Sequence, residues 1–161
     1  MNNTSAATAL KKKTIYDLYL SNTAYINNWD LVDLTAQHIV GHYLADKDTS
    51  MLTRLVLSRS LWDRRIAMLS TYHFIRQGDS REALRIAELL LTDSHDLIHK
   101  AVGWMLREVG KRCSMESECR FLDEHAARMP RTMLRYAIER FPEKLRMHYL
   151  RSKTNGREQE S

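Results

Sequence analysis

Trp29 and Asp33 are the residues of this sequence whose types and spacing best suit chemistry. They follow Asn28, a favoured helix N-cap residue, so the sequence predicts a helix from Trp29 to about Tyr43. Because the two residues are four apart, the indole and the carboxylate would lie on one face of that helix. A dry core strongly disfavours an unpaired carboxylate. The pair therefore indicates a site that meets developing positive charge.

Trp104 is a second tryptophan with neighbours that suggest a site. The helix predicted around it has a complete apolar stripe without the indole, and its neighbours at helical spacing, Lys100 and Arg107, are basic. An indole among cations is either a surface feature or part of a site. The spacing also fits a plainer interpretation, in which Trp29 and Trp104 are core residues and the arginines form a solvated face.

The composition predicts one all-α domain. The chain has 161 residues, of which 43% are hydrophobic and 28% are charged, so it can bury a core of its own. Five glycines and two prolines are few, and β-branched residues do not alternate with polar ones, which favours helices throughout. The formal net charge of +5 favours an anionic partner, either nucleic acid or an acidic membrane surface.

Two pairs of histidines have the four-residue spacing that can bind zinc. They are His38 with His42 and His95 with His99. Neither pair has the glutamate of the H-E-x-x-H motif or an evident third ligand, so no metal site is predicted. Motifs for acyl transfer, nucleotide hydrolysis and hydride transfer are also absent, and no organic cofactor is expected.

The sequence also indicates where the protein acts. Cys113 and Cys119 lie six residues apart without a matching CxxC pair, which favours free thiols in a reducing compartment. The N-terminus has no apolar signal region, and no apolar run approaches the ~20 residues that cross a bilayer. We therefore expect a cytoplasmic protein with no membrane segment.

Apolar periodicity and turn residues predict a series of antiparallel helix pairs. The second helices of these pairs begin near Trp29, Leu61, His95 and Pro130. A spacing of roughly 32 to 36 residues is typical of a helical solenoid, and the absence of tetratricopeptide and ankyrin signatures leaves HEAT-like, armadillo-type pairs. We expect a flexible N-terminus over residues 1–9, a single repeat domain over 10–151 and a disordered tail over 152–161.

In such a solenoid the second helices share a concave surface. The polar and aromatic residues that this would bring together are Trp29, Asp33, Arg64, Arg65, Lys100, Trp104, Arg107, Arg131 and Arg135. The collection is basic and aromatic, which suits contacts to the phosphates of a nucleic acid.

Four blocks of the sequence also resemble a known family. The blocks are Asn27–Asp33 (NNWDLVD), Leu61–Ala67 (LWDRRIA), Ile98–Glu108 (IHKAVGWMLRE) and Met129–Ala137 (MPRTMLRYA). In this order they are similar to the bacterial DNA alkylation repair enzymes, the AlkD-like DNA glycosylases, over about Lys11 to Leu150. The resemblance implies a HEAT-like solenoid that wraps duplex DNA and hydrolyses the N-glycosidic bond of cationic N3- and N7-alkylated purines.

The resemblance also implies roles for individual residues. Trp29, Trp104 and Asp33 match the two tryptophans and the aspartate of the family's catalytic cleft, and Arg65 matches an arginine that holds the DNA backbone. Arg64, Lys100, Arg107, Arg131 and Arg135 are the further residues that we expect to contact DNA. No deep base-flipping pocket is implied. The protein would act in the bacterial cytoplasm, associated with the nucleoid.

An alkylated purine already carries a positive charge, so the enzyme would need to stabilise only the sugar as it becomes oxocarbenium-like and to supply water. Asp33 could do this electrostatically, and each tryptophan face could add a cation–π term of ~0.5–2 kcal/mol. Lys100 could form a Schiff base, but nothing in the sequence lowers its pKa, which favours phosphate contact.

One departure from the family concerns the N-terminus. Family members have further helices before the first helix of this sequence, so we expect a truncated member or a fragment. The first hairpin would then expose its apolar face and self-associate. A non-catalytic DNA-binding or scaffold module is the alternative function, and a protein–protein adaptor is a third, less favoured because the expected concave face is basic.

Overall fold

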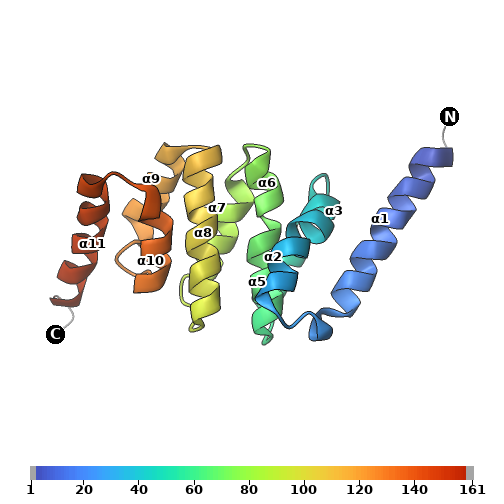
Figure 1. The fold of residues 1–161 in the computed structure, drawn as a ribbon, viewed down its shortest axis with the longest axis horizontal. Helices are drawn as coiled ribbons and strands as arrows, with labels where there is room; N and C mark the ends of the chain where they lie inside the picture. Colours follow the sequence, from blue (N-terminus) through green and yellow to red (C-terminus); the bar gives the residue numbers. More distant parts are fainter. Residues whose placement is uncertain (1–2, 159–161) are drawn as a thin grey trace. The chain divides into compact units, whose positions relative to one another are not determined.

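The computed structural model describes the backbone of residues 3–158 and the side chains of residues 5–151. Every regular element in the described backbone is a helix, with no strand (Figure 1), and the predicted all-α fold is confirmed. None of these described helices is long and apolar enough to cross a membrane. The chain divides into two compact units, Met1–His73 and Phe74–Ser161, each built from its own helices.

The first unit contains HEAT-like helix pairs. Its elements are α1 (Asn3–Ser21), the 3-10 turn η1 (Thr23–Tyr25), α2 (Trp29–Ala36), the π-helical segment η2 (Gln37–Gly41), α3 (His42–Leu44), α4 (Ser50–Val56) and α5 (Leu61–Ser70). The short helix α6 (Tyr72–Arg76) crosses the boundary between the units. Because α2, η2 and α3 follow without a gap, they form the single helix that the sequence predicts from Trp29.

Capping and burial fix how α2 begins and which way it faces. The Asn28 side chain accepts a hydrogen bond from the Asp30 N–H at 3.0 Å, as the sequence predicts. Val32 and Ala36 are fully buried. The helix packs against α5, so residues that flank the buried stripe, including Asp33, lie beside α5.

The second unit is organised around its longest central helix. Its elements are α7 (Arg81–Leu89), α8 (Asp96–Arg112), α9 (Met115–His125), α10 (Arg131–Ala137), the 3-10 turn η3 (Ile138–Arg140) and α11 (Glu143–Glu158). Helix α8 packs against α7, α9 and α10. Its buried apolar side chains are Ile98, Ala101, Val102, Met105, Leu106 and Val109. The apolar stripe predicted for this helix is therefore its core face, and Trp104 lies outside it.

The ends of the chain are more helical than the sequence predicts. Helix α1 begins at Asn3, so residues 3–9 are helical where a flexible segment was expected. Ala6, Ala7 and Ala9 explain this, since alanine has the highest helix propensity. Helix α11 likewise continues to Glu158 through most of the predicted tail. Residues 1–2 and 159–161 of these two predictions lie outside the described residues.

Gly110 lies close to the end of α8 and also has a role in helix packing. The sequence predicts that this helix ends near Lys111, with Gly110 as the terminating residue, and α8 ends one residue later, at Arg112. A Cβ atom at position 110 would overlap the carboxyl group of Glu118 on α9. Gly110 therefore also makes room for a neighbouring side chain.

Candidate active site

Asp33 and Arg65, predicted separately as a catalytic carboxylate and a DNA contact, form a bidentate ion pair. Arg65 Nε donates to Asp33 Oδ1 at 2.9 Å, and Nη2 donates to Oδ2 at 2.8 Å. The Arg65 side chain is 6% exposed and the Asp33 side chain is 15% exposed. Because two parallel bonds join a planar guanidinium to a planar carboxylate, the orientation of Asp33 is fixed. The carboxylate is thus held in place at the edge of the core and keeps a small accessible area.

Trp29 lies one helical turn before Asp33 and is 51% exposed. The interpretation of Trp29 as a core residue is therefore wrong. Its position at the first residue of α2 places the indole on the same face as Asp33. An accessible aromatic surface and an anchored carboxylate are thus neighbours in the first unit.

Gly41 holds the helix that carries Asp33 close to α5. A Cβ atom at position 41 would overlap the carbonyl oxygen of Ser70 and lie 2.7 Å from the Cβ atom of His73. The Ser70 hydroxyl also lies 3.4 Å from the Ala36 carbonyl oxygen, to which it donates. This direct contact between two helix backbones sets the distance that the Asp33–Arg65 pair must bridge.

Arg64, a predicted DNA contact, is bound to the loop before α5. Its Nη1 donates to the carbonyl oxygens of Ser58 at 3.2 Å and Arg59 at 3.0 Å. The side chain is half-buried. These bonds restrain the guanidinium, so Arg64 is less available to a phosphate than a fully exposed arginine.

Trp104 and Lys100 lie on α8 in the second unit. Trp104 is half-buried, which is less burial than its core neighbours on α8 have. Lys100 Nζ lies 2.9 Å from Asp96 Oδ2, and both side chains of this ion pair are exposed. The Lys100 ammonium, by hydrogen bonding, lowers the pKa of Asp96 below its ordinary value. Lys100 is thus accessible to DNA, although it already has a carboxylate beside it.

Arg107 is engaged with carboxylates on two sides. Its Nη1 forms an ion pair with Glu139, and its side chain is 18% exposed. The Coulombic attraction of Arg107 also acts on Glu118, whose pKa is nevertheless raised to about 8 because burial outweighs it. Neither Arg107 Nε nor Glu118 Oε1 has a hydrogen-bond partner among the described residues. The predicted DNA contact of Arg107 therefore competes with interactions inside the unit.

Arg131 and Arg135 are exposed on α10. This helix packs closely on α8. The contact leaves no room for a side chain at Gly103, where a Cβ atom would overlap the Met133 carbonyl oxygen. Gly103 directly precedes Trp104, so the same contact determines where the indole lies. The two arginines are the most accessible of the predicted DNA contacts.

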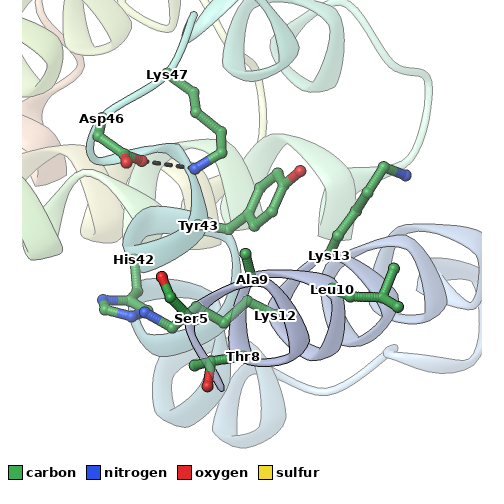
Figure 2. Close-up of a pocket in the computed structure, with 10 residues that line it drawn as sticks. All are labelled: Ser5, Thr8, Ala9, Leu10, Lys12, Lys13, His42, Tyr43, Asp46 and Lys47. Carbon is green, nitrogen blue, oxygen red and sulfur yellow. Dashed lines mark hydrogen bonds and ion pairs between the residues drawn. The ribbon is translucent and has the colours of Figure 1, made fainter. Parts of the chain in front are cut away.

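A groove between α1 and α3 in the first unit was not predicted from the sequence (Figure 2). Its volume is about 660 Å³, and three of its lining residues are lysines: Lys12, Lys13 and Lys47. Lys47 Nζ lies 2.6 Å from Asp46 and 4.6 Å from the centre of the Tyr43 ring, and Lys13 is paired with Asp17. Each of these carboxylates offsets one lysine charge, so the groove is only mildly basic.

His95 and His99 form hydrogen bonds with the backbone. His95 caps α8 by accepting from the Leu97 N–H at 3.2 Å, and His99 Nε2 lies 2.5 Å from the Asp93 carbonyl oxygen. Within the described residues, no group of three or more metal-binding side chains occurs. Cys113 and Cys119 are free thiols.

The predicted catalytic residues are thus divided between the units, with Trp29 and Asp33 in the first and Trp104 in the second. Sequence reasoning did not anticipate the partners of these residues. Only a weak signal was present for one of them: Asp33 and Arg65 lie 32 residues apart, which is the spacing of one predicted repeat.

Comparison with known proteins gives an assignment. The family model for the DNA alkylation repair enzyme matches residues 3–141. The match includes every residue singled out above as a candidate catalytic or DNA-binding residue. A search of curated proteins finds no relative that matches the chain.

Proposed function

The chain belongs to the DNA alkylation repair enzyme family, and we propose that it is a DNA glycosylase for cationic N3- and N7-alkylated purines in duplex DNA. The observation that carries the proposal is the arrangement around Asp33. Its carboxylate is anchored by Arg65 and keeps a small accessible area, and the exposed Trp29 is one turn away. An anchored anion beside an aromatic face suits a transition state with a positively charged sugar.

The proposed reaction is hydrolysis of the bond between C1′ of the deoxyribose and the alkylated purine. The bonding electron pair moves to the purine and neutralises its positive charge, so no general acid is needed. A water oxygen forms the new bond to C1′, and one of its protons is released. Asp33 stabilises the oxocarbenium-like sugar and accepts a hydrogen bond from that water.

We propose that Trp29 and Trp104 add to this stabilisation through their π faces. A cation over an indole is favoured by ~0.5–2 kcal/mol, with the higher values where water is excluded. Trp29 is accessible and Trp104 is half-buried. Both therefore present at least part of an aromatic surface to a ligand.

Arg65 has two proposed tasks, of which the first is visible in its geometry. It orients Asp33 through the bidentate pair, and contact with a DNA phosphate would be the second. Because only 6% of its side chain is exposed, a phosphate must approach closely or the guanidinium must turn. Either event would weaken its hold on Asp33 and strengthen the field of that carboxylate at the sugar.

The remaining contacts to DNA are proposed to be electrostatic. Arg131 and Arg135 are exposed, and Lys100 is accessible beside Asp96. Arg64 and Arg107 are restrained by bonds within their own units, so we expect weaker contributions from them. Phosphate contacts make affinity fall steeply with salt and depend little on sequence.

Self-association is proposed through α1. Leu10, Ile15 and Leu18 on this helix are 66%, 53% and 63% exposed, respectively. Exposed apolar side chains of this kind favour association. Sedimentation at several concentrations tests the proposal by comparing the parent chain with Leu18→Glu. The added charge should shift the variant toward the monomer. A parent chain that stays monomeric would exclude it.

Excision from a defined duplex tests the proposed activity. The chain is incubated with duplexes that contain one N7-methylguanine, and abasic sites are converted to strand breaks with alkali. Excision above background, absent from an undamaged duplex, supports the glycosylase. DNA binding without excision would instead favour the alternative, a non-catalytic DNA-binding module.

A further inference from the structure

The groove between α1 and α3 lies outside the residues assigned to the proposed active site (Figure 2). It belongs entirely to the first unit. Lys12 and Lys13 line it from α1, Tyr43 lines it from α3, and Lys47 lines it from the turn that follows α3. With a volume of about 660 Å³, the groove has room for a ligand much larger than a single ion. The lining therefore combines several hydrogen-bond donors with space for an extended anion.

The charges around the groove leave one ammonium group in excess. Lys47 Nζ donates to Asp46 Oδ1 at 2.6 Å, and Lys13 is paired with Asp17. Lys12 is exposed and forms no ion pair with any residue that the structure describes. Two carboxylates thus offset two of the three lysine charges. The remaining positive charge matches a group with one negative charge, such as a single phosphodiester.

Lys12 and Lys47 come from different elements and act on the same carboxylate. The pKa of Asp46 is lowered, mainly by the hydrogen bond from Lys47 and also by the Coulombic attraction of Lys12. Because such attraction weakens with distance, Lys12 is near the Asp46–Lys47 pair on the opposite side of the groove. An anion between the two helices would therefore meet two ammonium groups.

Tyr43 holds Lys47 in place. The Lys47 Nζ atom lies 4.6 Å from the centre of the Tyr43 ring, a cation–π contact. The ring in turn stacks on Tyr16 of α1, with ring centres 4.1 Å apart. These contacts restrain the lysine before a ligand arrives, which reduces the entropy that binding would cost.

The groove is close enough to the proposed active site for one duplex to reach both. Tyr43 lies ten residues after Asp33 on the continuous helix formed by α2, η2 and α3. At about 1.5 Å per residue, this separation is roughly 15 Å along the helix axis. Base pairs are stacked about 3.4 Å apart, so the same distance spans roughly four of them.

We propose that the groove between α1 and α3 binds a backbone phosphate of duplex DNA, with Lys12 and Lys47 as the cations that contact it. This inference rests on the proposed function, because it requires the chain to bind DNA. Phosphates project from a DNA strand and can enter a recess between two helices. Lipid headgroups form a plane, which suits a flat basic face better.

Lys12→Ala tests the proposal, because it removes the ammonium group that has no ion pair. Fluorescence anisotropy gives the affinity for an undamaged duplex over a series of salt concentrations. The slope of log affinity against log salt should decrease by about 0.9, and affinity at ~0.1 M salt should fall by roughly eightfold, as expected for one lost phosphate contact. The melting temperature should stay at the parent value, since the side chain is exposed.

Lys11→Ala is the matched control, because Lys11 is an exposed lysine on the same helix and does not line the groove. It should keep the parent slope. If Lys11→Ala lowers the slope as much as Lys12→Ala, the effect comes from net charge and the proposal fails. If the parent binds duplex and Lys12→Ala keeps the parent slope, the groove does not contact DNA, while the proposed function stands.

Asp46→Asn gives a test of opposite sign. The Asp46 side chain is 81% exposed, so its replacement should leave the fold intact. Removal of this carboxylate frees Lys47 and should tighten duplex binding by up to about fivefold, the range of one exposed charge interaction. Unchanged or weaker binding would contradict the proposal.

A titration with inorganic pyrophosphate distinguishes DNA from a free phosphate ligand. Saturable binding that Lys12→Ala abolishes, together with an unchanged salt slope for the duplex, would show a site for free phosphate and overturn the proposed DNA contact. A parent chain that binds no duplex at any salt concentration would overturn the proposed function itself, and this inference with it.

Discussion

Each of the two units has a largely buried carboxyl group near an arginine, and the two groups differ in their hydrogen bonds. In the first, the Asp33 carboxylate meets the Arg65 guanidinium through two hydrogen bonds of 2.9 and 2.8 Å. In the second, Glu118 is 1% exposed, and Arg107 attracts it, yet Glu118 Oε1 and Arg107 Nε have no hydrogen-bond partners among the described residues. The comparison shows that proximity of opposite charges is not sufficient. A carboxylate at the edge of the core has a fixed orientation only when hydrogen bonds join both of its oxygens to the arginine, as in the Asp33–Arg65 pair.

The difference has a consequence for function. Arg65 satisfies both oxygens of Asp33, so Asp33 is suited to act as an oriented anion. Burial dominates at Glu118 and raises its pKa to about 8, so near neutral pH this carboxyl group is mostly protonated. Glu118 is therefore a poor electrostatic stabiliser, although it is also an acid near an arginine.

The largest expected effect on stability comes from removing one partner of the Asp33–Arg65 ion pair. Arg65→Ala leaves the Asp33 carboxylate without its partner, and removal of one partner of a buried pair costs ~3–5 kcal/mol of folding free energy. Denaturation in urea measures the loss. The double variant Arg65→Met with Asp33→Leu should recover most of it, because no charge then remains. A loss below about 1 kcal/mol for Arg65→Ala would mean that the pair contributes little.

Each unit also has a glycine at a close helix contact, and these positions should respond alike. Gly41→Ala and Gly103→Ala introduce a Cβ atom that overlaps a backbone carbonyl, of Ser70 and Met133, respectively. Such overpacking typically costs ~1–3 kcal/mol. If the contact around Gly41 positions Asp33, Gly41→Ala should also slow excision. Thermal melting and single-turnover rates measured together check this, and an unchanged rate would separate the helix contact from catalysis.

The raised pKa of Glu118 predicts that the stability of the protein depends on pH. The pKa of Glu118 is 4.5 in the ordinary case and about 8 in the folded protein. Between these values the folded state holds a proton that the unfolded chain has lost. The contribution of Glu118 to the free energy of unfolding therefore falls by about 1.4 kcal/mol per pH unit as pH rises. It levels off above the pKa of Glu118 in the folded protein.

Glu118→Gln removes this titration and should flatten the pH profile of stability between those two pKa values. Glu116→Gln is the matched control, because Glu116 is exposed on the same helix and its charge is already in water. Urea denaturation at several pH values gives the comparison. An unchanged slope in Glu118→Gln would show that Glu118 titrates normally.

The smallest expected effect is at Lys100. Its ion pair with Asp96 is exposed, so Lys100→Ala should change stability by no more than ~1 kcal/mol. If Lys100 contacts a phosphate, the same variant should weaken binding to all duplexes similarly. The slope of log affinity against log salt should decrease by about 0.9. Equal slopes for the variant and the parent would remove Lys100 from the DNA contacts.

The sequence predicts the fold well because local signals agree with each other. Asn28 caps α2 as expected, and the buried apolar positions of α8 follow helical spacing. The sequence does not show that Gly110 also makes room for Glu118, because a glycine required by a helix contact looks the same in sequence as one near a helix end. The alanine-rich start of α1 has small residues without apolar periodicity, so the sequence does not predict a helix there.

The site is only partly predictable, for a different reason. Residue type and helical spacing predict that Trp29 and Asp33 share one helix face, but they leave open whether the Trp29 indole is buried or exposed. The partners of Asp33 and Arg107 depend on contacts between different helices, and the period of the repeat contains no information about such distances. Whether Arg65 meets a carboxylate or a phosphate is accordingly a question that helix packing decides.

The central claim is that Asp33 acts through its charge. The most direct test is single-turnover excision from an N7-methylguanine duplex by Asp33→Asn, compared with Asp30→Asn, which removes an exposed carboxylate from the same helix. Loss of an oriented electrostatic partner should slow excision roughly a hundredfold to a thousandfold, with duplex affinity retained, while Asp30→Asn stays at the parent rate. If Asp33→Asn excises as fast as the parent, the Asp33 carboxylate is not the catalytic anion.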